Sequence, residues 1–445
     1  MVAPSASTPP TSDPKTTVAT TVGKTRVSDP FESLGVGGTF RRALGDKGYT
    51  QPTPIQSQAI PQLLQGKDLL GVAQTGTGKT AAFALPLLQR LDEENSPPKP
   101  RRPRALILAP TRELALQIHE ELTSLGRYTK LRHAFIIGGV SQNPQIRGLA
   151  QGVDVLVATP GRLLDLAGQR HVDLSEVSVL VLDEADRLLD MGFVRDVKRI
   201  VALTPKTRQS LLFSATMPKE VAALARELLK DPVRVDVSPK QLTVKEIDQR
   251  VVMVDNGDKQ RMLEHLLRDD EVSRAIVFTR TKHGANKVAR KLENAGIGAE
   301  AIHGNKSQNA RQRALQNFKN GDAWVLVATD IAARGIDIDA VSHVFNYELP
   351  HEPESYVHRI GRTARAGATG AAWSLVDPSE RGRLRAVERL IKFRPEEVPV
   401  DLPPRDPAEQ NHESRPRPQN SGRPASNQRP GEQRRRRRRR RQPAA

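Results

Sequence analysis

The segment that restricts the fold most is Ala73-Gln-Thr-Gly-Thr-Gly-Lys-Thr80, which joins a short apolar run to a longer helical stretch. The run Leu69–Val72 has the length of a buried strand, and Ala81–Leu91 has the length and composition of a helix. Glycines in such a turn let successive backbone N–H groups point into one anion site, which the dipole of the following helix reinforces. The segment therefore predicts a phosphate-binding loop.

Two side chains at the end of this loop complete the prediction. Lys79 would reach the outer phosphates of a nucleotide, and the Thr80 hydroxyl would ligate Mg²⁺. The general pattern begins with glycine, whereas this chain has Ala73, but the curl of the backbone depends on the later glycines.

A second strand-like run, Val177–Leu182, ends in Asp183-Glu-Ala-Asp186. Ligands of α/β sheets gather at the carboxyl ends of strands, so Asp183 is placed to hold Mg²⁺ and Glu184 to accept a proton from an attacking water. The alternative is that these acids only cap the next helix. A phosphate loop upstream favours the catalytic interpretation.

Apolar runs and helical stretches alternate along most of the chain, which predicts an α/β fold with mostly parallel sheets flanked by helices. In the first part, strands are expected at Leu69–Val72, Ala105–Ala109, Val153–Ala158, Val177–Leu182 and Ser210–Phe213, with a helix at Arg112–Leu125. In the second part, they are expected at Arg250–Val254, Ala275–Thr279, Val325–Ala328, Val344–Asn346 and Ala371–Val376.

Composition sets the predicted domain boundaries. Residues 1–30 are rich in Ser, Thr and Pro and are expected to be a disordered leader. Two domains follow at 31–237 and 247–393, joined by a polar linker at 238–246. Residues 394–445 are expected to be a disordered Arg/Pro-rich tail that binds RNA and ends in Arg434–Arg441.

Charge and residue usage narrow the function class. The chain has 445 residues, no cysteine and a formal net charge of +18, so thiolate chemistry is excluded and a polyanionic partner is favoured. No apolar run approaches the roughly 20 residues that cross a bilayer, and a cytoplasmic protein without membrane attachment is expected.

The phosphate loop and the Asp-Glu-Ala-Asp quartet together make the chain resemble a DEAD-box ATP-dependent RNA helicase of bacterial type, in helicase superfamily 2. The resemblance extends from Phe31 to about Asp377, with the motifs in family order. It implies two tandem RecA-like domains, ATP and Mg²⁺ as cofactors, and single-stranded and duplex RNA as partners. It further implies RNA-stimulated hydrolysis of ATP to ADP and phosphate, coupled to local unwinding of RNA or remodelling of RNA–protein complexes.

The resemblance also assigns the nucleotide site. Gly48-Tyr-Thr-Gln-Pro-Thr-Pro-Ile-Gln56 resembles the adenine-reading segment, in which the Gln56 amide would pair with the adenine edge and Phe31 would stack on the ring. The expected ATP-binding residues are Phe31, Gln56, Gln74, Thr75, Gly76, Thr77, Gly78, Lys79, Thr80, Gly335 and Asp337.

Residues of the second domain complete the expected catalytic set. In His358-Arg-Ile-Gly-Arg-Thr-Ala-Arg365, the resemblance makes Arg362 and Arg365 the cations that meet the γ-phosphate. The catalytic residues are then Lys79, Asp183, Glu184, Arg362 and Arg365. The family commonly has Gly where Ala364 stands and a basic residue where Ala368 stands, so local RNA affinity at Ala368 is in doubt.

Coupling and RNA binding are likewise implied by the resemblance. Ser214-Ala-Thr216 is expected to bond to the quartet through Asp186, and His358 to link nucleotide and RNA. The RNA contacts offer N–H groups, hydroxyls or cations, which suits a sugar–phosphate backbone and predicts binding without sequence preference. They are Pro110, Thr111, Arg112, Gly138, Gly139, Thr159, Pro160, Gly161, Arg162, Arg280, Gln308, Arg311 and Thr329.

Three alternatives remain open from the sequence. A DNA helicase with similar core domains is disfavoured by the adenine-reading segment and the quartet. A non-catalytic RNA clamp is disfavoured by the intact set of catalytic residues, and a membrane-associated ATPase by the lack of an amphipathic face. The Arg tail is either a solubilising segment or a non-specific RNA tether. Ribosomal precursors or the RNA-decay machinery are family-level expectations for partners, and a monomer suffices.

Overall fold

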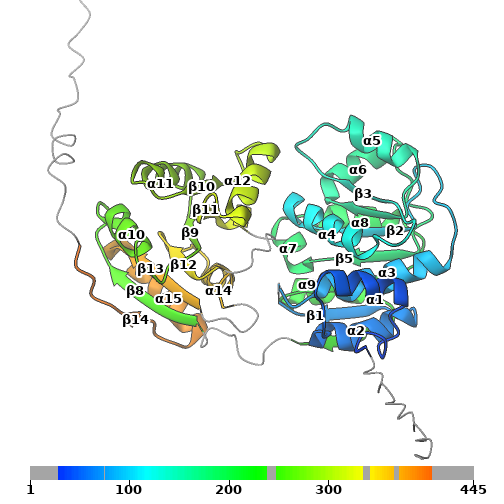
Figure 1. The fold of residues 1–445 in the computed structure, drawn as a ribbon, viewed down its shortest axis with the longest axis horizontal. Coiled ribbons are helices and arrows are strands. Elements are labelled where there is room, and N and C mark those ends of the chain that lie inside the picture. Colours follow the sequence, from blue (N-terminus) through cyan, green and yellow to red (C-terminus); the bar gives the residue numbers. More distant parts are fainter. Residues whose placement is uncertain (1–28, 75, 238–246, 334–340, 365–369, 403–445) are drawn as a thin grey trace, which may run out of the picture. The chain divides into compact units, whose positions relative to one another are not determined.

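The computed structural model describes residues 29–74, 76–237, 247–333, 341–364 and 370–402. Residues 1–28 of the predicted leader, the predicted linker and the tail from residue 403 lie outside these ranges. The described residues form two α/β domains, each built on a parallel sheet of seven strands (Figure 1). The predicted fold class is therefore confirmed.

The first domain has the strand order β3-β4-β2-β5-β6-β1-β7. Its strands are β1 Leu69–Val72, β2 Ala105–Leu108, β3 His133–Ile136, β4 Val155–Ala158, β5 Val179–Leu182, β6 Gln209–Ser214 and β7 Val233–Asp236. Its helices are α1 Gly38–Asp46, α2 Pro54–Leu64, α3 Lys79–Glu93, α4 Arg112–Leu125, α5 Asn143–Ala150, α6 Pro160–Gly168, α7 Ala185–Asp190, α8 Val194–Ala202 and α9 Lys219–Leu228.

Side-chain alternation along the strands divides the core of this domain into two layers, because successive residues of a strand point to opposite faces. In β2, Ala105 and Ile107 join the cluster that includes side chains of α1, α2, α3 and α4. Leu106 and Leu108 join the cluster on the other face, with side chains of α5, α6, α7, α8 and α9. Burial on both faces explains why the central strands are continuous apolar runs in the sequence.

The second domain has the order β10-β11-β9-β12-β13-β8-β14. Its strands are β8 Ile247–Met253, β9 Ala275–Thr279, β10 Ala299–Ile302, β11 Val325–Thr329, β12 His343–Asn346, β13 Gly370–Val376 and β14 Glu396–Glu397. Its helices are α10 Lys259–Leu267, α11 Lys282–Asn294, α12 Gln308–Asn320, α13 Asp330–Ala333, α14 Pro353–Ile360, the 3-10 helix η2 Pro378–Glu380, and α15 Arg381–Ile391.

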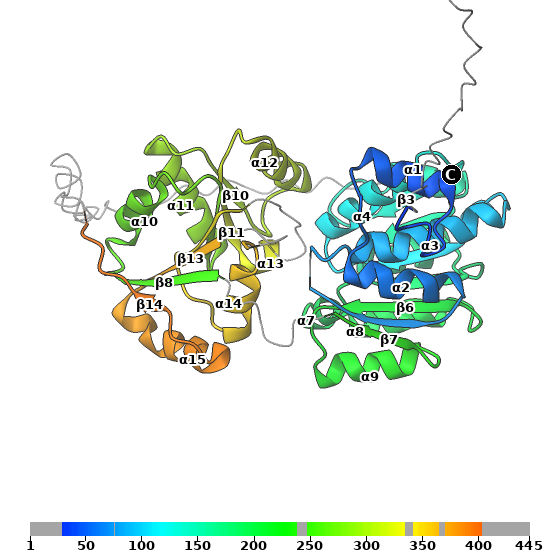
Figure 2. The same cartoon turned by 60° about the horizontal axis from the view of Figure 1, so that its bottom comes forward.

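The two sheets have the same topology. If the strands of each domain are numbered 1 to 7 along the chain, both sheets have the strand order 3-4-2-5-6-1-7. Strand β12 of the second domain is therefore the counterpart of β5, whose carboxyl end carries the acidic quartet. In both domains the helices cover both faces of the sheet (Figure 2).

The second sheet extends beyond the predicted domain boundary at residue 393. Strand β14 pairs in parallel with β8, where Glu396 stands opposite Arg250 and Glu397 opposite Val251, and the Val398 N–H donates to the Val251 carbonyl at 2.9 Å. Both glutamates of β14 are exposed, so this edge strand carries no apolar signal that sequence reasoning could find.

Candidate active site

Three neighbouring strands of the first domain bring the predicted phosphate loop and the acidic quartet to one edge of the sheet. Strand β6 pairs with β1 on one side and β5 on the other, all in parallel. The phosphate loop follows β1, Asp183 follows β5, and Ser214 is the last residue of β6. Because the carboxyl ends of parallel strands meet at the same edge, these segments face one another.

Glycines with positive φ shape the phosphate loop. Gly76 has φ 80° and Gly78 has φ 85°, conformations in which a side chain would be strained. Helix α3 then begins at Lys79, whose buried ammonium donates to the Ala73 carbonyl at 2.8 Å, and the Thr77 hydroxyl donates to the Gln74 carbonyl. The loop thus folds back on its own start, while Thr75 lies outside the described residues.

The predicted adenine-reading segment is tied to the phosphate loop by Gln56. Its Oε1 accepts from the Thr53 N–H at 3.0 Å in a capping box at the start of α2, and its Nε2 donates to the Gly78 carbonyl at 3.1 Å. A Cβ on Gly78 would lie 2.5 Å from this nitrogen. Gly78 is therefore required both by its backbone angle and by the close approach of Gln56.

Phe31 lies in the hydrophobic core of the first domain, with 2% of its surface exposed. Little of the ring is free in this conformation to stack on a base. Adenine stacking by Phe31 stays a prediction, and it requires the ring to be more exposed than it is here.

Burial raises the pKa of Asp183. Desolvation, with a smaller contribution from the neighbouring Glu184, raises it to about 6 against the favourable field of the Lys79 ammonium. Its Oδ1 accepts from the Glu184 N–H at 2.9 Å. A buried carboxylate beside other carboxylates is stabilised by a cation, which is the environment expected of a divalent-metal ligand.

Glu184 has a strained backbone, with φ 49° and ψ 56° in the left-handed region. A non-glycine residue in that region costs about 1–2 kcal/mol. Its side chain is buried, and its Oε2 forms an ion pair with Arg187 Nη1 at 3.4 Å but accepts no hydrogen bond from the described residues. Strain and an unsatisfied buried carboxylate oxygen both indicate a functional position.

A hydrogen-bond network joins the quartet to the end of β6. Asp186 Oδ2 accepts from both the N–H and the hydroxyl of Thr216, and the Asp186 N–H donates to the Ser214 hydroxyl at 3.2 Å. The Ser214 hydroxyl in turn donates to the Thr216 carbonyl at 2.7 Å. The structure brings together three of the four residues expected to couple the site to RNA, while the fourth, His358, lies on α14 of the second domain.

The RNA-contact residues predicted in the first domain lie at the ends of adjacent strands. Arg112, which opens α4, packs so closely on the next segment that a Cβ on Gly139 would lie 2.1 Å from its Nη1. Arg162 donates to the Val140 carbonyl at 3.2 Å. These segments follow β2, β3 and β4, which are neighbours in the sheet, and they include Pro110, Thr111, Gly138, Thr159, Pro160 and Gly161.

In the second domain, the predicted RNA residues lie at strand ends and helix starts. Arg280 follows β9, Thr329 ends β11, and Gln308 opens α12, with Arg311 one turn later. His358 lies on α14 and Arg362 follows its end. Gly335, Asp337, Arg365 and Ala368 lie outside the described residues. Ala364 stands where the family commonly has glycine. Its φ of 54° lies in the left-handed region, which is strained for any residue that carries a Cβ.

Sequence reasoning missed two residues of this domain that make many contacts. Arg359, the second residue of the His358–Arg365 motif, is 1% exposed and donates to both carboxylate oxygens of Asp330. Glu348 accepts three hydrogen bonds from Arg280. Glu348 could have been found from its position just after a strand, because the acidic quartet of the first domain also follows a strand.

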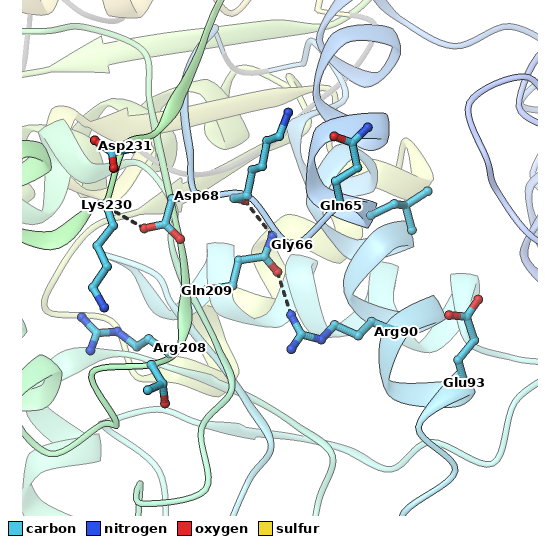
Figure 3. A pocket seen from close by; sticks show the side chains of 12 residues that line it. Gln65, Gly66, Asp68, Arg90, Glu93, Arg208, Gln209, Lys230 and Asp231 are labelled. Carbon is cyan, nitrogen blue, oxygen red and sulfur yellow. Dashed lines mark hydrogen bonds between the residues drawn. The ribbon is translucent and has the colours of Figure 1, made fainter.

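A separate hollow lies at the opposite, amino-terminal edge of the first sheet (Figure 3). Its residues are Leu64–Asp68, Arg90, Glu93, Thr207–Gln209, Lys230 and Asp231. The buried Asp68 crosslinks this edge, because its two carboxylate oxygens accept from the Ser210 and Lys230 N–H groups, each at 2.8 Å. None of the predicted site residues lies in this hollow.

Membrane-spanning helices and metal-binding clusters are both absent from the described ranges. No helix there combines the length and apolar character needed to span a membrane. No group of three or more His, Asp or Glu side chains in those ranges is arranged to hold a metal ion. A magnesium site made of one carboxylate, one hydroxyl and nucleotide phosphates does not need such a group.

Comparisons with known proteins agree with this geometry. The DEAD/DEAH box helicase family matches residues 53–224, and the helicase conserved C-terminal domain matches residues 258–367. The ATP-dependent RNA helicase CshA of Limosilactobacillus reuteri is 43% identical over 82% of this chain and 72% of its own length. The DEAD-box ATP-dependent RNA helicase CshA of Geobacillus kaustophilus is 44% identical over 83% of this chain and 78% of its own length.

Solved structures give the same result. Dbp5 of S. cerevisiae, bound to RNA and ADP BeF3, has a TM-score of 0.75 and 33% identity, covering 84% of this chain and 96% of that one. The DEAD-box helicase Mss116, bound to ssRNA and UDP-BeF, has a TM-score of 0.74 and 28% identity, covering 83% of this chain and 79% of that one. The chain belongs to the DEAD-box family of ATP-dependent RNA helicases.

Proposed function

We propose that this chain hydrolyses ATP with the residues at the carboxyl edge of the first sheet and uses the cycle to separate or remodel RNA. In this assignment the loop from Ala73 to Thr80 binds the phosphates, with Lys79 at the outer ones. Glu184 takes a proton from the attacking water, and Arg362 and Arg365 stabilise the charge that develops on the γ-phosphate. The observation that carries the proposal is the strand order β5-β6-β1, which gathers the loop, the quartet and Ser214 at one edge.

The Thr80 hydroxyl and the Asp183 carboxylate fit a magnesium ion. Both supply hard oxygen ligands, and the Asp183 carboxyl has a pKa raised by burial that a nearby cation would lower. When bound, the ion would neutralise charge on the phosphates. The protein's own part is to fix the carboxylate, which the Glu184 N–H does through its hydrogen bond to Asp183 Oδ1.

The network of Asp186, Ser214 and Thr216 supports coupling between this site and RNA. Asp186 belongs to the quartet, while Ser214 ends β6 and Thr216 lies two residues later, so movement of one segment is transmitted to the other through three hydrogen bonds. We assign the RNA contacts to the backbone, without sequence preference, because the residues that follow β2, β3 and β4 offer N–H groups, hydroxyls and arginines.

The proposal also covers the arginine-rich tail, the oligomeric state, the localisation and the partners. The Arg434–Arg441 run would act as a non-specific RNA tether that raises the local RNA concentration, since guanidinium groups bind phosphate and stack on unpaired bases. The chain would work as a monomer in the cytoplasm, on ribosomal precursors or with the RNA-decay machinery.

Displacement of a short strand from a tailed RNA duplex tests the proposed activity, with a matched DNA duplex as control. Wild-type protein with ATP should displace the RNA strand selectively, and ATP turnover should rise when single-stranded RNA is added. Glu184→Gln should still bind ATP and RNA but lose turnover by a factor of about 10² or more. RNA binding without displacement or turnover in the wild type would favour the clamp instead.

A further inference from the structure

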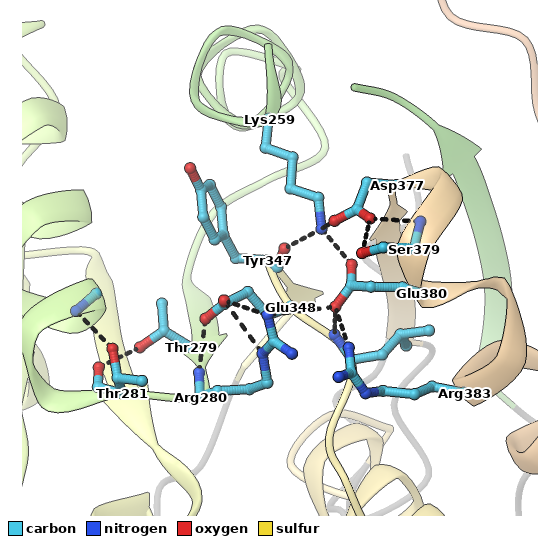
Figure 4. A network of polar contacts seen from close by, with 12 residues as sticks. Lys259, Thr279, Arg280, Thr281, Tyr347, Glu348, Asp377, Ser379, Glu380 and Arg383 are labelled. Atoms are coloured by element: carbon cyan, nitrogen blue, oxygen red, sulfur yellow. Dashed lines mark hydrogen bonds and ion pairs between the residues drawn. The ribbon is translucent and has the colours of Figure 1, made fainter. Parts of the chain in front are cut away.

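The segment 346–349, Asn346-Tyr-Glu-Leu349, begins with the last residue of β12, in the middle of the second sheet. Its neighbour β9 ends just before Arg280, the arginine predicted to face RNA, and β12 is the counterpart of β5. Glu348 therefore occupies the strand end at which the first domain places its catalytic carboxylates. Its side chain contacts other residues of its own domain (Figure 4).

Glu348 holds the backbone and the side chain of Arg280 at once. Its Oε2 accepts from the Arg280 N–H at 2.8 Å, and its Oε1 accepts from Nε at 3.1 Å and from Nη2 at 2.9 Å. This arrangement fixes the plane of the guanidinium group, which has five N–H donors in a rigid fork. About a quarter of the Arg280 side chain is exposed, so the donors that Glu348 does not use can reach a phosphate.

The main chain of the same residue is bound by Arg359 of helix α14. Arg359 Nη1 donates to the Glu348 carbonyl at 2.6 Å and to Asn346 Oδ1 at 3.1 Å. The rest of that guanidinium group donates to Asp330, which follows the predicted RNA residue Thr329. Arg359 lies on α14 between His358 and Ile360, and Arg362 follows at the end of the helix.

A buried ion cluster fixes the remaining polar groups of segment 346–349. The ammonium of Lys259, on α10, donates to the Tyr347 carbonyl at 3.1 Å and contacts the carboxylates of Glu380 and Asp377. Glu380 is fully buried, and its other oxygen accepts from the Leu349 N–H at 3.1 Å. Burial by itself would raise the pKa of Asp377, but Ser379 and Lys259 outweigh it and lower that pKa to about 2, so Asp377 is charged at neutral pH.

These contacts leave segment 346–349 little freedom, because side chains from α10, η2 and α14 and the residue after β9 satisfy its polar groups. A displacement of Arg280 is therefore passed to the Glu348 side chain and, through its own main chain, to Arg359. If RNA and nucleotide each favour one position of this segment, each changes the binding affinity of the other by the same factor.

We propose that Glu348 is a positioning residue that links RNA binding at Arg280 to helix α14, which carries His358 and precedes Arg362. The inference rests on the proposed function, since it requires that Arg280 contacts RNA and that α14 serves the nucleotide. It assigns to Glu348 an effect on RNA affinity and on the factor by which bound nucleotide strengthens RNA binding. The ion cluster around Lys259 holds the segment in place for both.

Glu348→Gln tests the proposal, because the amide keeps the shape of the side chain and the main-chain contacts but loses the charge that holds Arg280. RNA affinity is measured by fluorescence anisotropy with and without a non-hydrolysable ATP analogue. The expected result is an RNA dissociation constant raised about tenfold and a weaker enhancement by the analogue. Glu396→Gln, which changes an exposed carboxylate of the same domain, should alter both values less than twofold.

A double variant separates positioning from general destabilisation. If Glu348 acts through Arg280, the loss of RNA affinity in Glu348→Gln combined with Arg280→Gln should equal that in Arg280→Gln alone. Additive losses, or a lowered melting temperature with unchanged RNA affinity and enhancement, would overturn the proposal. If Glu348→Gln yields no folded protein, Arg280→Lys replaces it, since it keeps the charge but loses the fork, and unchanged enhancement there would likewise overturn it.

The wild type distinguishes this inference from the proposed function. Wild-type protein whose ATP turnover does not respond to RNA would overturn the proposed function itself. Wild-type protein that responds to RNA, together with Glu348→Gln that retains full affinity and enhancement, would overturn only the role of Glu348.

Discussion

Thr216 donates two hydrogen bonds to one carboxylate oxygen of Asp186, from its backbone N–H and from its hydroxyl, each 2.9 Å long. The two residues are 30 positions apart: Asp186 lies in α7, which follows β5, and Thr216 lies two residues after the end of the neighbouring strand β6. A hydrogen bond to a buried charged group contributes about 1.5–3 kcal/mol. The pair is thus a strong connection between the acidic quartet and the end of β6.

Thr216→Val should weaken coupling more than hydrolysis. The substitution keeps the shape of the side chain and removes only the hydroxyl bond to Asp186. We expect the number of RNA strands displaced per ATP hydrolysed to fall about tenfold, as the loss of one such bond implies. The control is Thr123→Val, which removes an exposed hydroxyl that donates to the His119 carbonyl. Equal yields per ATP in wild type and Thr216→Val would contradict a coupling role.

Gly78→Ala should damage nucleotide binding through geometry alone. Gly78 has φ 85°, and a Cβ there would lie 2.5 Å from Gln56 Nε2, so the substitution strains the loop and displaces Gln56. We expect affinity for an ATP analogue, measured by titration calorimetry, to fall at least about tenfold, from about 1–2 kcal/mol of strain plus the displacement.

Gly66→Ala is the matched control for that variant. Gly66 also has a positive φ, 77°, but a Cβ there would meet no atom of a non-adjacent residue within 4 Å, and the residue lines the hollow at the opposite edge of the sheet. The variant should lose about 1 kcal/mol of stability and keep its ATP affinity. Similar losses of ATP affinity in both variants would show that backbone strain alone, not the contact with Gln56, determines the result.

The central strands were predicted from sequence because they are buried on both faces. Predicted and observed bounds agree for Leu69–Val72 and Ala275–Thr279, and the other predicted strands differ by one to three residues at an end. The strands that gave no usable signal, β3, β7, β10 and β14, are the edges of the two sheets. An edge strand is covered on fewer sides, so its residues need not be apolar, as the exposed Glu396 and Glu397 illustrate.

The site residues also fall into two groups, those that a local sequence pattern reveals and those that depend on contacts between distant segments. The phosphate loop and the quartet are local in sequence, so their chemistry is visible in a few consecutive residues. The contact of Gln56 with Gly78 and that of Glu348 with Arg280 join segments 22 and 68 positions apart. Their existence depends on strand order, which no local pattern in this chain specifies.

His133 should make the first domain less stable in acid. Burial lowers its pKa to about 4, helped by the neighbouring His119 and opposed by Asp154. Because the folded pKa lies below the value of 6.5 in the unfolded chain, the unfolded state binds more protons as the pH falls from 6.5 towards 4. The free energy of unfolding should therefore decrease across this window, by about 2 kcal/mol at pH 4.5.

Urea unfolding of wild type and His133→Gln between pH 4.5 and 8 measures this contribution. The variant lacks the titrating ring, so its stability should fall less steeply below pH 6.5, while the two pH profiles should run parallel above pH 7. Profiles that run parallel over the whole range would show that His133 does not carry the acid sensitivity.

Asp68→Asn should destabilise the first domain without altering its nucleotide site. The Asp68 carboxylate accepts from the Ser210 N–H group and from the Lys230 N–H group (the latter in Figure 3) at the amino-terminal edge of the sheet. An amide turns one acceptor into a donor, which would face an N–H group and leave it unsatisfied, at a cost of about 2–3 kcal/mol. Asp231→Asn, an exposed carboxylate lining the same hollow, should change stability by less than about 0.5 kcal/mol.

The two readouts for these variants are urea unfolding and affinity for an ATP analogue at a temperature where both proteins are folded. Strands β1 and β6 extend from Asp68 to the phosphate loop and Ser214, so they form a direct path for a distortion from one edge of the sheet to the other. Retained ATP affinity in Asp68→Asn would show that the close-packed strands confine the damage to the amino-terminal edge. Loss of ATP affinity in step with stability would instead make this edge part of the nucleotide site's support.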